Sequence, residues 1–171
     1  EEWDNLAFDS RERLFVSNSR DGSVVEVLPS GQPRTISESG MVLPGGVAAV
    51  QRGGRESVFV TDTWTLREFD ALTGKAIGVE QSSWLPTGLL APLSISADGS
   101  NFILTSWISN AVEVWNPDTR QVLENYRDFA TPINAIRFQG DLVVAELGTK
   151  PAARVVRATS TGRTELATGL G

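Results

Sequence analysis

Short apolar stretches alternate with polar turns along the whole chain, and the pattern recurs four times. Each copy is an apolar strand, a polar turn and a second strand that ends in a polar residue. The copies span residues 4–19, 45–63, 93–107 and 133–147. The position before the first core residue of each copy is held in turn by Asn5, Gly46, Ser94 and Asn134. An internal repeat of about 40 residues strongly restricts the fold class, because each copy corresponds to one structural unit.

The second half of each unit repeats as well, as two short strands around a tight turn. These segments are 23–36, 65–79, 111–126 and 153–167. They are rich in Val, Ile, Phe and Leu with partial alternation of apolar and polar positions, which predicts strands. Gly, Pro, Asp, Ser and Thr supply the turns between them.

Four strands per unit at a period of about 40–45 residues predict the antiparallel blades of a β-propeller. The predicted fold class is therefore all-β, in a single propeller domain with no amphipathic helix of useful length. The expected blades are approximately 4–40, 45–84, 92–128 and 132–168.

The stretches "NLAFD…LFVSNS" and "GVAAV…VFVTDT" resemble the NHL-repeat pattern. On these motifs the chain is similar to the six-bladed propeller group that includes NHL-repeat proteins, the senescence-marker/gluconolactonase family, paraoxonases and strictosidine synthase-like proteins. Four visible blades fit two interpretations. The chain is either a compact four-bladed ring or, as we favour, four consecutive blades of a six-bladed or larger propeller. An open arc would expose apolar blade faces, so self-association is expected.

Charge and composition narrow the function. The net charge is −6 and no cluster of Lys and Arg appears, which argues against nucleic-acid binding. There is no Cys and no His, so thiolate catalysis, Ser-His systems and most transition-metal sites are excluded. No apolar run approaches the length of about 20 residues needed to span a bilayer, so we expect no membrane insertion.

Loops between blades and loops between second and third strands share one face of a propeller. Four of the five tryptophans map to that face, which indicates a binding surface. They are Trp3, Trp64, Trp84 and Trp107. The alternative is that these side chains fill the wedge-shaped gaps between blades.

The second strands end on the same face with polar residues that we assign to the candidate binding surface. They are Asn18, Asp62, Ser106 and Glu146. The alternative is structural, because such side chains commonly satisfy loop backbone amides.

The resemblance implies one further site. In paraoxonases and gluconolactonases the start of the innermost strand supplies Asn and Asp ligands to a central calcium ion. The segments around Asp4, Asn5 and Asn134 look like such ligand segments, and calcium binds carboxylate and amide oxygens without His. Gly46 and Ser94 stand in the same column and offer neither group. The alternative role of the two asparagines is to cap strand starts.

Two functions follow. The first is a binding or scaffold module that takes a small-molecule or protein ligand through the tryptophan-bearing face. The alternative is a calcium-dependent hydrolase of lactones or esters, like gluconolactonase or paraoxonase. The resemblance also favours a secreted or periplasmic location.

Overall fold

The computed structural model describes residues 3–38, 40–81, 91–148 and 153–169. Within these ranges every regular element is a β-strand, and the strands form four antiparallel sheets of four. The described residues contain no helix with the length and hydropathy that a membrane crossing requires. The predicted all-β propeller of four-stranded blades is confirmed.

Each sheet is built from four strands that are consecutive in the chain, so each sheet is one blade. Blade 1 consists of β1 (Trp3–Phe8), β2 (Leu14–Asn18), β3 (Ser23–Val27) and β4 (Pro33–Ser37). Blade 2 consists of β5 (Pro44–Arg52), β6 (Arg55–Asp62), β7 (Thr65–Asp70) and β8 (Ala76–Gln81). Blade 3 consists of β9 (Ser94–Asp98), β10 (Asn101–Ser106), β11 (Ala111–Asn116) and β12 (Gln121–Tyr126). Blade 4 consists of β13 (Pro132–Phe138), β14 (Asp141–Glu146), β15 (Arg154–Thr159) and β16 (Gly162–Thr168).

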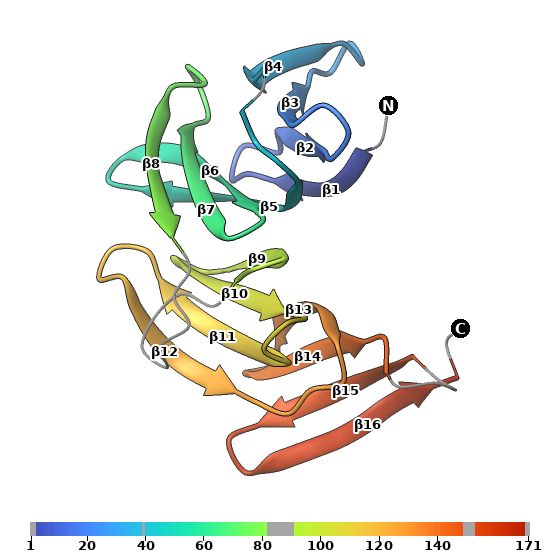
Figure 1. The fold of residues 1–171 in the computed structure, drawn as a ribbon. Coiled ribbons are helices and arrows are strands. Elements are labelled where there is room, and N and C mark those ends of the chain that lie inside the picture. Colours follow the sequence, from blue (N-terminus) through green and yellow to red (C-terminus); the bar gives the residue numbers. More distant parts are fainter. Residues whose placement is uncertain (1–2, 39, 82–90, 149–152, 170–171) are drawn as a thin grey trace.

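The innermost strands β1, β5, β9 and β13 lie next to one another in chain order, and the blades radiate from them (Figure 1). Their register with the second strands agrees with the repeat alignment. Leu6 pairs with Val16, Val47 with Val60, Ile95 with Leu104 and Ala135 with Val144. The register slips at the start of β1, β5 and β13, which is a β-bulge recurring at the same place in three blades.

The hydrophobic core lies between blades, in one cluster for each pair of neighbours. The cluster between blades 1 and 2 includes Phe15, Val24, Val47, Val58 and Val60. The cluster between blades 2 and 3 includes Phe59, Leu66, Phe102, Leu104 and Trp115. The cluster between blades 3 and 4 includes Ile103, Val112, Leu142, Val144 and Val156. The strands alternate because one set of side chains faces the preceding blade and the other set faces the following blade.

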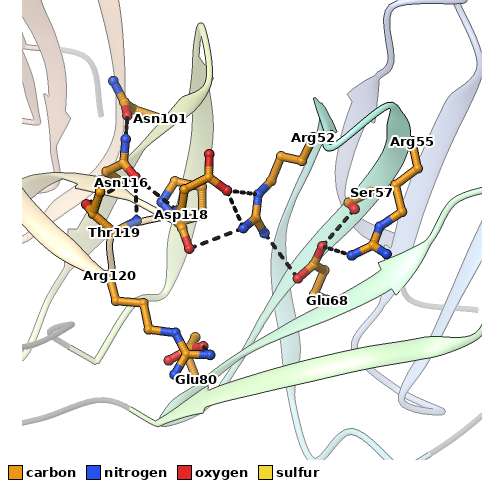
Figure 2. Close-up of polar contacts among 11 residues, drawn as sticks. Arg52, Arg55, Ser57, Glu68, Glu80, Asn101, Asn116, Asp118, Thr119 and Arg120 are labelled. Carbon is orange, nitrogen blue, oxygen red and sulfur yellow. Dashed lines mark hydrogen bonds and ion pairs between the residues drawn. The ribbon is translucent and has the colours of Figure 1, made fainter.

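Polar side chains at the edges add a second layer of contact between blades. Figure 2 shows the contact between blades 2 and 3, where Nη2 of Arg52 lies 2.6 Å from Oδ1 of Asp118 and its Nη1 lies 3.2 Å from Oε2 of Glu68. Arg137 makes the equivalent connection between blades 4 and 3, with Nη2 at 2.9 Å from Oδ2 of Asp98. The blades are therefore joined by an apolar interior and by ion pairs at its rim.

Candidate functional site

A pocket of about 310 Å³ opens where the innermost strands begin, and we call it the axial pocket. All four blades contribute to it. Its polar lining comes from Asp4, Asn5, Ser19, Thr61, Thr63 and Ser94. Its apolar lining comes from Leu43, Pro92, Leu93, Trp107 and Ile133, beside the glycine at position 45. All of these residues belong to strand ends, links between blades or loops between second and third strands, which is the face that the sequence predicts for binding.

The bulge at the start of β1 positions Asp4 and Asn5. They lie between the paired residues Trp3 and Leu6, where the register of β1 against β2 shifts. The backbone N–H of Asn5 donates to Oγ of Ser17 at 3.2 Å, and that hydroxyl donates at 2.6 Å to the carbonyl of Gly45 in the next blade. The hydroxyl thus fixes the bulge of blade 1 against the start of blade 2.

Two glycines allow blades 2 and 3 to approach each other closely at the pocket. A β-carbon on Gly46 would lie 2.6 Å from the backbone nitrogen of Ile95, and one on Gly45 would lie 2.8 Å from the carbonyl oxygen of Leu93. Any larger residue would push the two inner strands apart. Gly45 also faces the acidic group of the pocket, because the same β-carbon would lie 3.6 Å from Oδ2 of Asp4.

The axial pocket has a simple electrostatic character. Among the described residues that line it, Asp4 is the one ionisable side chain, and none is Lys or Arg. Because no positively charged side chain in the lining offsets the Asp4 carboxylate, the pocket favours cationic or neutral ligands over anions.

The tryptophans that the sequence assigns to the binding face do not form one surface. Trp107 lines the axial pocket and is 46% exposed, and Trp64 is 44% exposed in the turn beside the lining residue Thr63. Trp3 is 48% exposed but lines a separate groove on blade 1 with Val16, Val25, Val27, Gly31 and Pro33. Trp84 lies outside the described residues. The binding role remains a prediction, and the geometry connects it most directly with Trp107.

The polar residues that end the second strands lie beneath this face and are buried. Oδ1 of Asp62 accepts the backbone N–H groups of Val42 at 2.8 Å and Leu43 at 3.0 Å, in the link that enters blade 2. Oε1 of Glu146 likewise accepts the N–H of Ala130 at 2.7 Å, in the link that enters blade 4. Both carboxylates tie the incoming link to their own blade.

The other two members of this set act within their own turns. Oδ1 of Asn18 accepts the N–H of Arg20 at 3.0 Å, and Oγ of Ser106 accepts the N–H of Ser109 at 3.3 Å. The contacts of all four side chains agree with the structural alternative raised from the sequence. They position the loops of the candidate face, and a direct ligand role for these side chains is still a prediction.

Each of the two buried carboxylates forms an ion pair with an arginine. Nε of Arg67 lies 2.8 Å from Oδ2 of Asp62, and Nε of Arg154 lies 2.5 Å from Oε2 of Glu146. Burial favours the protonated form of Asp62, but the Leu43 N–H, the Arg67 guanidinium and the Val42 N–H outweigh it. The pKa of Asp62 therefore lies below its ordinary value.

The three residues proposed as calcium ligands are divided between two places. Asp4 and Asn5 line the axial pocket, whereas Asn134 lines a groove on blade 4. Oδ1 of Asn134 accepts the N–H of Ala135 at 2.7 Å and the hydroxyl of Ser96 at 3.1 Å. In the part of the chain that the structure describes, no three Asp or Glu side chains gather in a way that could hold a metal. The calcium role remains a prediction.

Of the apolar lining of the axial pocket, sequence reasoning identified Trp107 but not Leu43, Pro92, Leu93 or Ile133. Leu43 and Pro92 lie in links between blades, outside the repeated segments, and Leu93 directly precedes β9. Sequence reasoning also did not identify the arginine partners Arg67 and Arg154. The sequence does contain a signal for these two ion pairs. In blades 2 and 4 the second strand ends with an acidic residue, and an arginine lies within the first three residues of the third strand.

No protein family matches the sequence, and no curated protein does. Solved structures do match. The chain is similar to Kuenenia stuttgartiensis hydrazine synthase, with a TM-score of 0.71 and 17% identity, over 95% of this chain and 48% of that one. It is also similar to a catalytically inactive virginiamycin B lyase from Staphylococcus aureus with quinupristin, with a TM-score of 0.70 and 13% identity, over 95% of this chain and 54% of that one.

A third similar structure is the glutaminyl cyclase of Myxococcus xanthus, with a TM-score of 0.63 and 11% identity, over 97% of this chain and 69% of that one. The chain thus spans about half the length of the first two propeller chains. At such identities the likeness concerns the fold and not the activity. The chain has the fold of four consecutive blades of an all-β propeller.

Proposed function

We propose that the propeller is a binding module and that the axial pocket is its ligand site. The observation that carries the proposal is the combination of the Asp4 carboxylate with the half-exposed indole of Trp107 in one pocket. A concave site with an apolar wall and a few convergent polar groups is the usual form of a small-molecule site. In the paraoxonase and gluconolactonase families that the sequence resembles, the start of the innermost strand supplies ligands to a central calcium ion, which supports a site at this end of the strands.

The lining favours a small cationic or neutral ligand with an apolar body. An ammonium group would pair with the Asp4 carboxylate and would be attracted to the face of the Trp107 indole. Leu43, Pro92 and Ile133 would cover the apolar part. An anionic ligand would meet the Asp4 charge with no lining cation to offset it.

Three probes of equal size test this selectivity. Benzylamine, benzyl alcohol and benzoate share one ring and differ in charge, and ligand-observed NMR reports the binding of each. Benzylamine should bind best, benzyl alcohol more weakly and benzoate not at all. Benzoate binding as strong as that of benzylamine would contradict the proposal.

Variants locate the site. Asp4→Asn keeps the size of the side chain and removes its charge, so it should reduce benzylamine binding to the level of benzyl alcohol. Trp107→Ala should abolish both. Trp3→Ala is the matched control, because that half-exposed tryptophan lines a different groove. Benzylamine binding that is unchanged in Trp107→Ala would place the ligand elsewhere and sink the proposal.

A calcium-dependent hydrolase of lactones or esters is the second candidate, and the presence of Asp4 and Asn5 in one pocket favours it. Calcium takes 6–8 oxygen ligands, and the described side chains of the pocket offer one carboxylate and one amide. Thermal melts in calcium and in EDTA separate the two candidates. A micromolar site in millimolar calcium would gain about 4 kcal/mol of stability, whereas the binding-module proposal predicts no shift. If a shift occurs, Asp4→Ala should remove it.

A further inference from the structure

Exposed apolar side chains adjoin the axial pocket on the side of blades 2 and 3, and we call them the apolar rim. Val42 is 78% exposed, Trp64 is 44% exposed and Ile108 is 52% exposed. Each is next in the chain to one of the lining residues Leu43, Thr63 and Trp107. Since consecutive Cα atoms are about 3.8 Å apart, the rim begins directly where the lining of the pocket ends.

The loops that carry the rim have a fixed backbone. The buried carboxylate of Asp62 accepts the backbone N–H of Val42 at 2.8 Å. Thr63, between that aspartate and Trp64, has a φ of 53°, a left-handed conformation that β-branched residues rarely adopt. Such strain persists only where surrounding contacts impose it, and it is concentrated at functional sites. The rim side chains are therefore preorganised, which lowers the entropic cost of binding.

The size of the axial pocket gives the rim a role. The volume of about 310 Å³ is at the lower end of the range for small-molecule sites. A partner that fills the pocket and continues beyond it must therefore lie on the rim. Scattered exposed apolar residues are ordinary, but a group of them around one pocket marks an interaction surface.

Charge indicates the chemistry of the partner. Asp4 is the one ionisable side chain of the described lining, and the whole chain has a net charge of −6. Both favour a basic partner, whereas an anionic bilayer would be repelled. On blade 1 the residue after the lining residue Ser19 is the exposed Arg20, so the apolar rim belongs to the opposite side of the pocket.

Building on the proposed function of the axial pocket, we infer that its partner is an extended protein or peptide segment that inserts a lysine side chain. The ammonium group pairs with Asp4, and the methylene stem lies against Trp107, as the stems of long basic side chains do on apolar surfaces. In an extended segment, the residues two places before and after the lysine point to the same side, about 7 Å away. Apolar side chains at these two places contact the rim, one over blade 2 and the other over blade 3.

Three acetylated and amidated peptides test the inference by isothermal titration. Leu-Ser-Lys-Ser-Leu should bind about tenfold more tightly than Ser-Ser-Lys-Ser-Ser, because two partly buried leucines add apolar contact. Leu-Ser-Gln-Ser-Leu should also bind at least tenfold more weakly than the first peptide, because it lacks the charge that pairs with Asp4.

The outcomes separate this inference from the proposed function. Equal affinity of the two lysine peptides would overturn the role of the rim, and equal affinity of the lysine and glutamine peptides with leucine would overturn the role of the lysine. Either result leaves the proposed function standing as long as benzylamine binds. Failure of benzylamine to bind would refute the proposed function itself.

Variants locate the contact on the rim. Val42→Ser combined with Ile108→Ser should reduce the affinity of Leu-Ser-Lys-Ser-Leu to that of Ser-Ser-Lys-Ser-Ser and leave the latter unchanged. Leu72→Ser is the matched control and should change neither, since Leu72 is 72% exposed in the turn between β7 and β8 on the opposite face. Circular dichroism should show an intact fold in each variant, because every replaced side chain is exposed. A preference for the leucine peptide that survives in the double variant would overturn the inference.

A bilayer of neutral lipid is the other surface that an apolar rim could contact. Sedimentation with phosphatidylcholine vesicles distinguishes the two partners, and we expect the protein to stay in solution. Sedimentation that the double variant abolishes would assign the rim to a bilayer and overturn the inference.

Discussion

Trp115 and Trp107 lie in the same blade and have opposite environments. Trp115 on β11 is 2% exposed and stacks on Phe102, with ring centroids 6.4 Å apart, in the core between blades 2 and 3. Trp107 follows β10 and is 46% exposed in the axial pocket. The Trp115 indole fills the space between two sheets, whereas about half of the Trp107 side chain is exposed to solvent in the pocket.

The comparison shows that different parts of a blade have different roles. The middles of the strands supply the interblade core, and the starts of the inner strands and the adjoining loops supply the pocket. Because the two sets of residues barely overlap, stability and binding should respond to different substitutions. Substitutions in the interblade core should therefore cost the most stability, and substitutions at the exposed rim the least.

Trp115→Ala should have the largest effect on stability. Removal of a fully buried indole leaves a cavity between two sheets, and such truncations destabilise by about 3–5 kcal/mol. Urea unfolding monitored by circular dichroism measures the loss. Trp107→Ala is the matched control and should change the free energy of unfolding by less than about 0.5 kcal/mol. Equal losses for the two variants would contradict the separation.

Asp62 should give stability a dependence on acid pH. Its pKa is lower in the folded protein than in the unfolded chain, so its contribution is fully present above the unfolded value of about 3.9. The contribution is lost as the pH falls through the folded pKa. Denaturant unfolding between pH 6 and pH 2.5 should show this decline.

Asp62→Asn provides the comparison for that profile. The variant keeps an oxygen acceptor for the Val42 and Leu43 amides but loses the charge that pairs with Arg67. It should cost about 1.5–3 kcal/mol at neutral pH, as expected for hydrogen bonds to a charged group. Its unfolding free energy should also depend less on pH. A profile as steep as that of the unaltered protein would assign the effect to other carboxylates.

Arg52→Ala should have a smaller effect, although the residue bridges two blades (Figure 2). Its partner Asp118 is 62% exposed at the side chain, and exposed ion pairs contribute about 0–1 kcal/mol. We expect a loss of about 1 kcal/mol that shrinks in high salt. Arg120→Ala is the control, because the pair of Arg120 with Glu80 is more exposed. A loss comparable to that of Trp115→Ala would show that ion pairs rather than the apolar core hold the blades together.

Much of the fold could be predicted because each blade repeats the same constraints. Apolar positions that alternate along a strand must face a neighbouring sheet on each side, so the strand middles of one unit predict those of the next. Trp115 illustrates this, since it lies in a repeated third strand and is buried in the core between blades 2 and 3.

The candidate site could be predicted only in part, because the loops that line it do not share the repeated sequence pattern of the strands. Asp4 and Asn5 were placed at the axial rim by the alignment, and both line the pocket. Asn134 stands in the same column, yet its side-chain oxygen is taken up by Ser96 and Ala135. The contribution of Leu43 depends on the path of a link between blades, which tertiary contacts decide.

The most direct test of the central claim is a titration with benzylamine followed through the tryptophan indole N–H signals by NMR. We expect the Trp107 signal to move in a saturable way while the Trp115 signal stays in place, and we expect Asp4→Asn to weaken the response. A Trp107 signal that does not move, or a Trp115 signal that moves equally, would contradict the assignment of the axial pocket as the binding site.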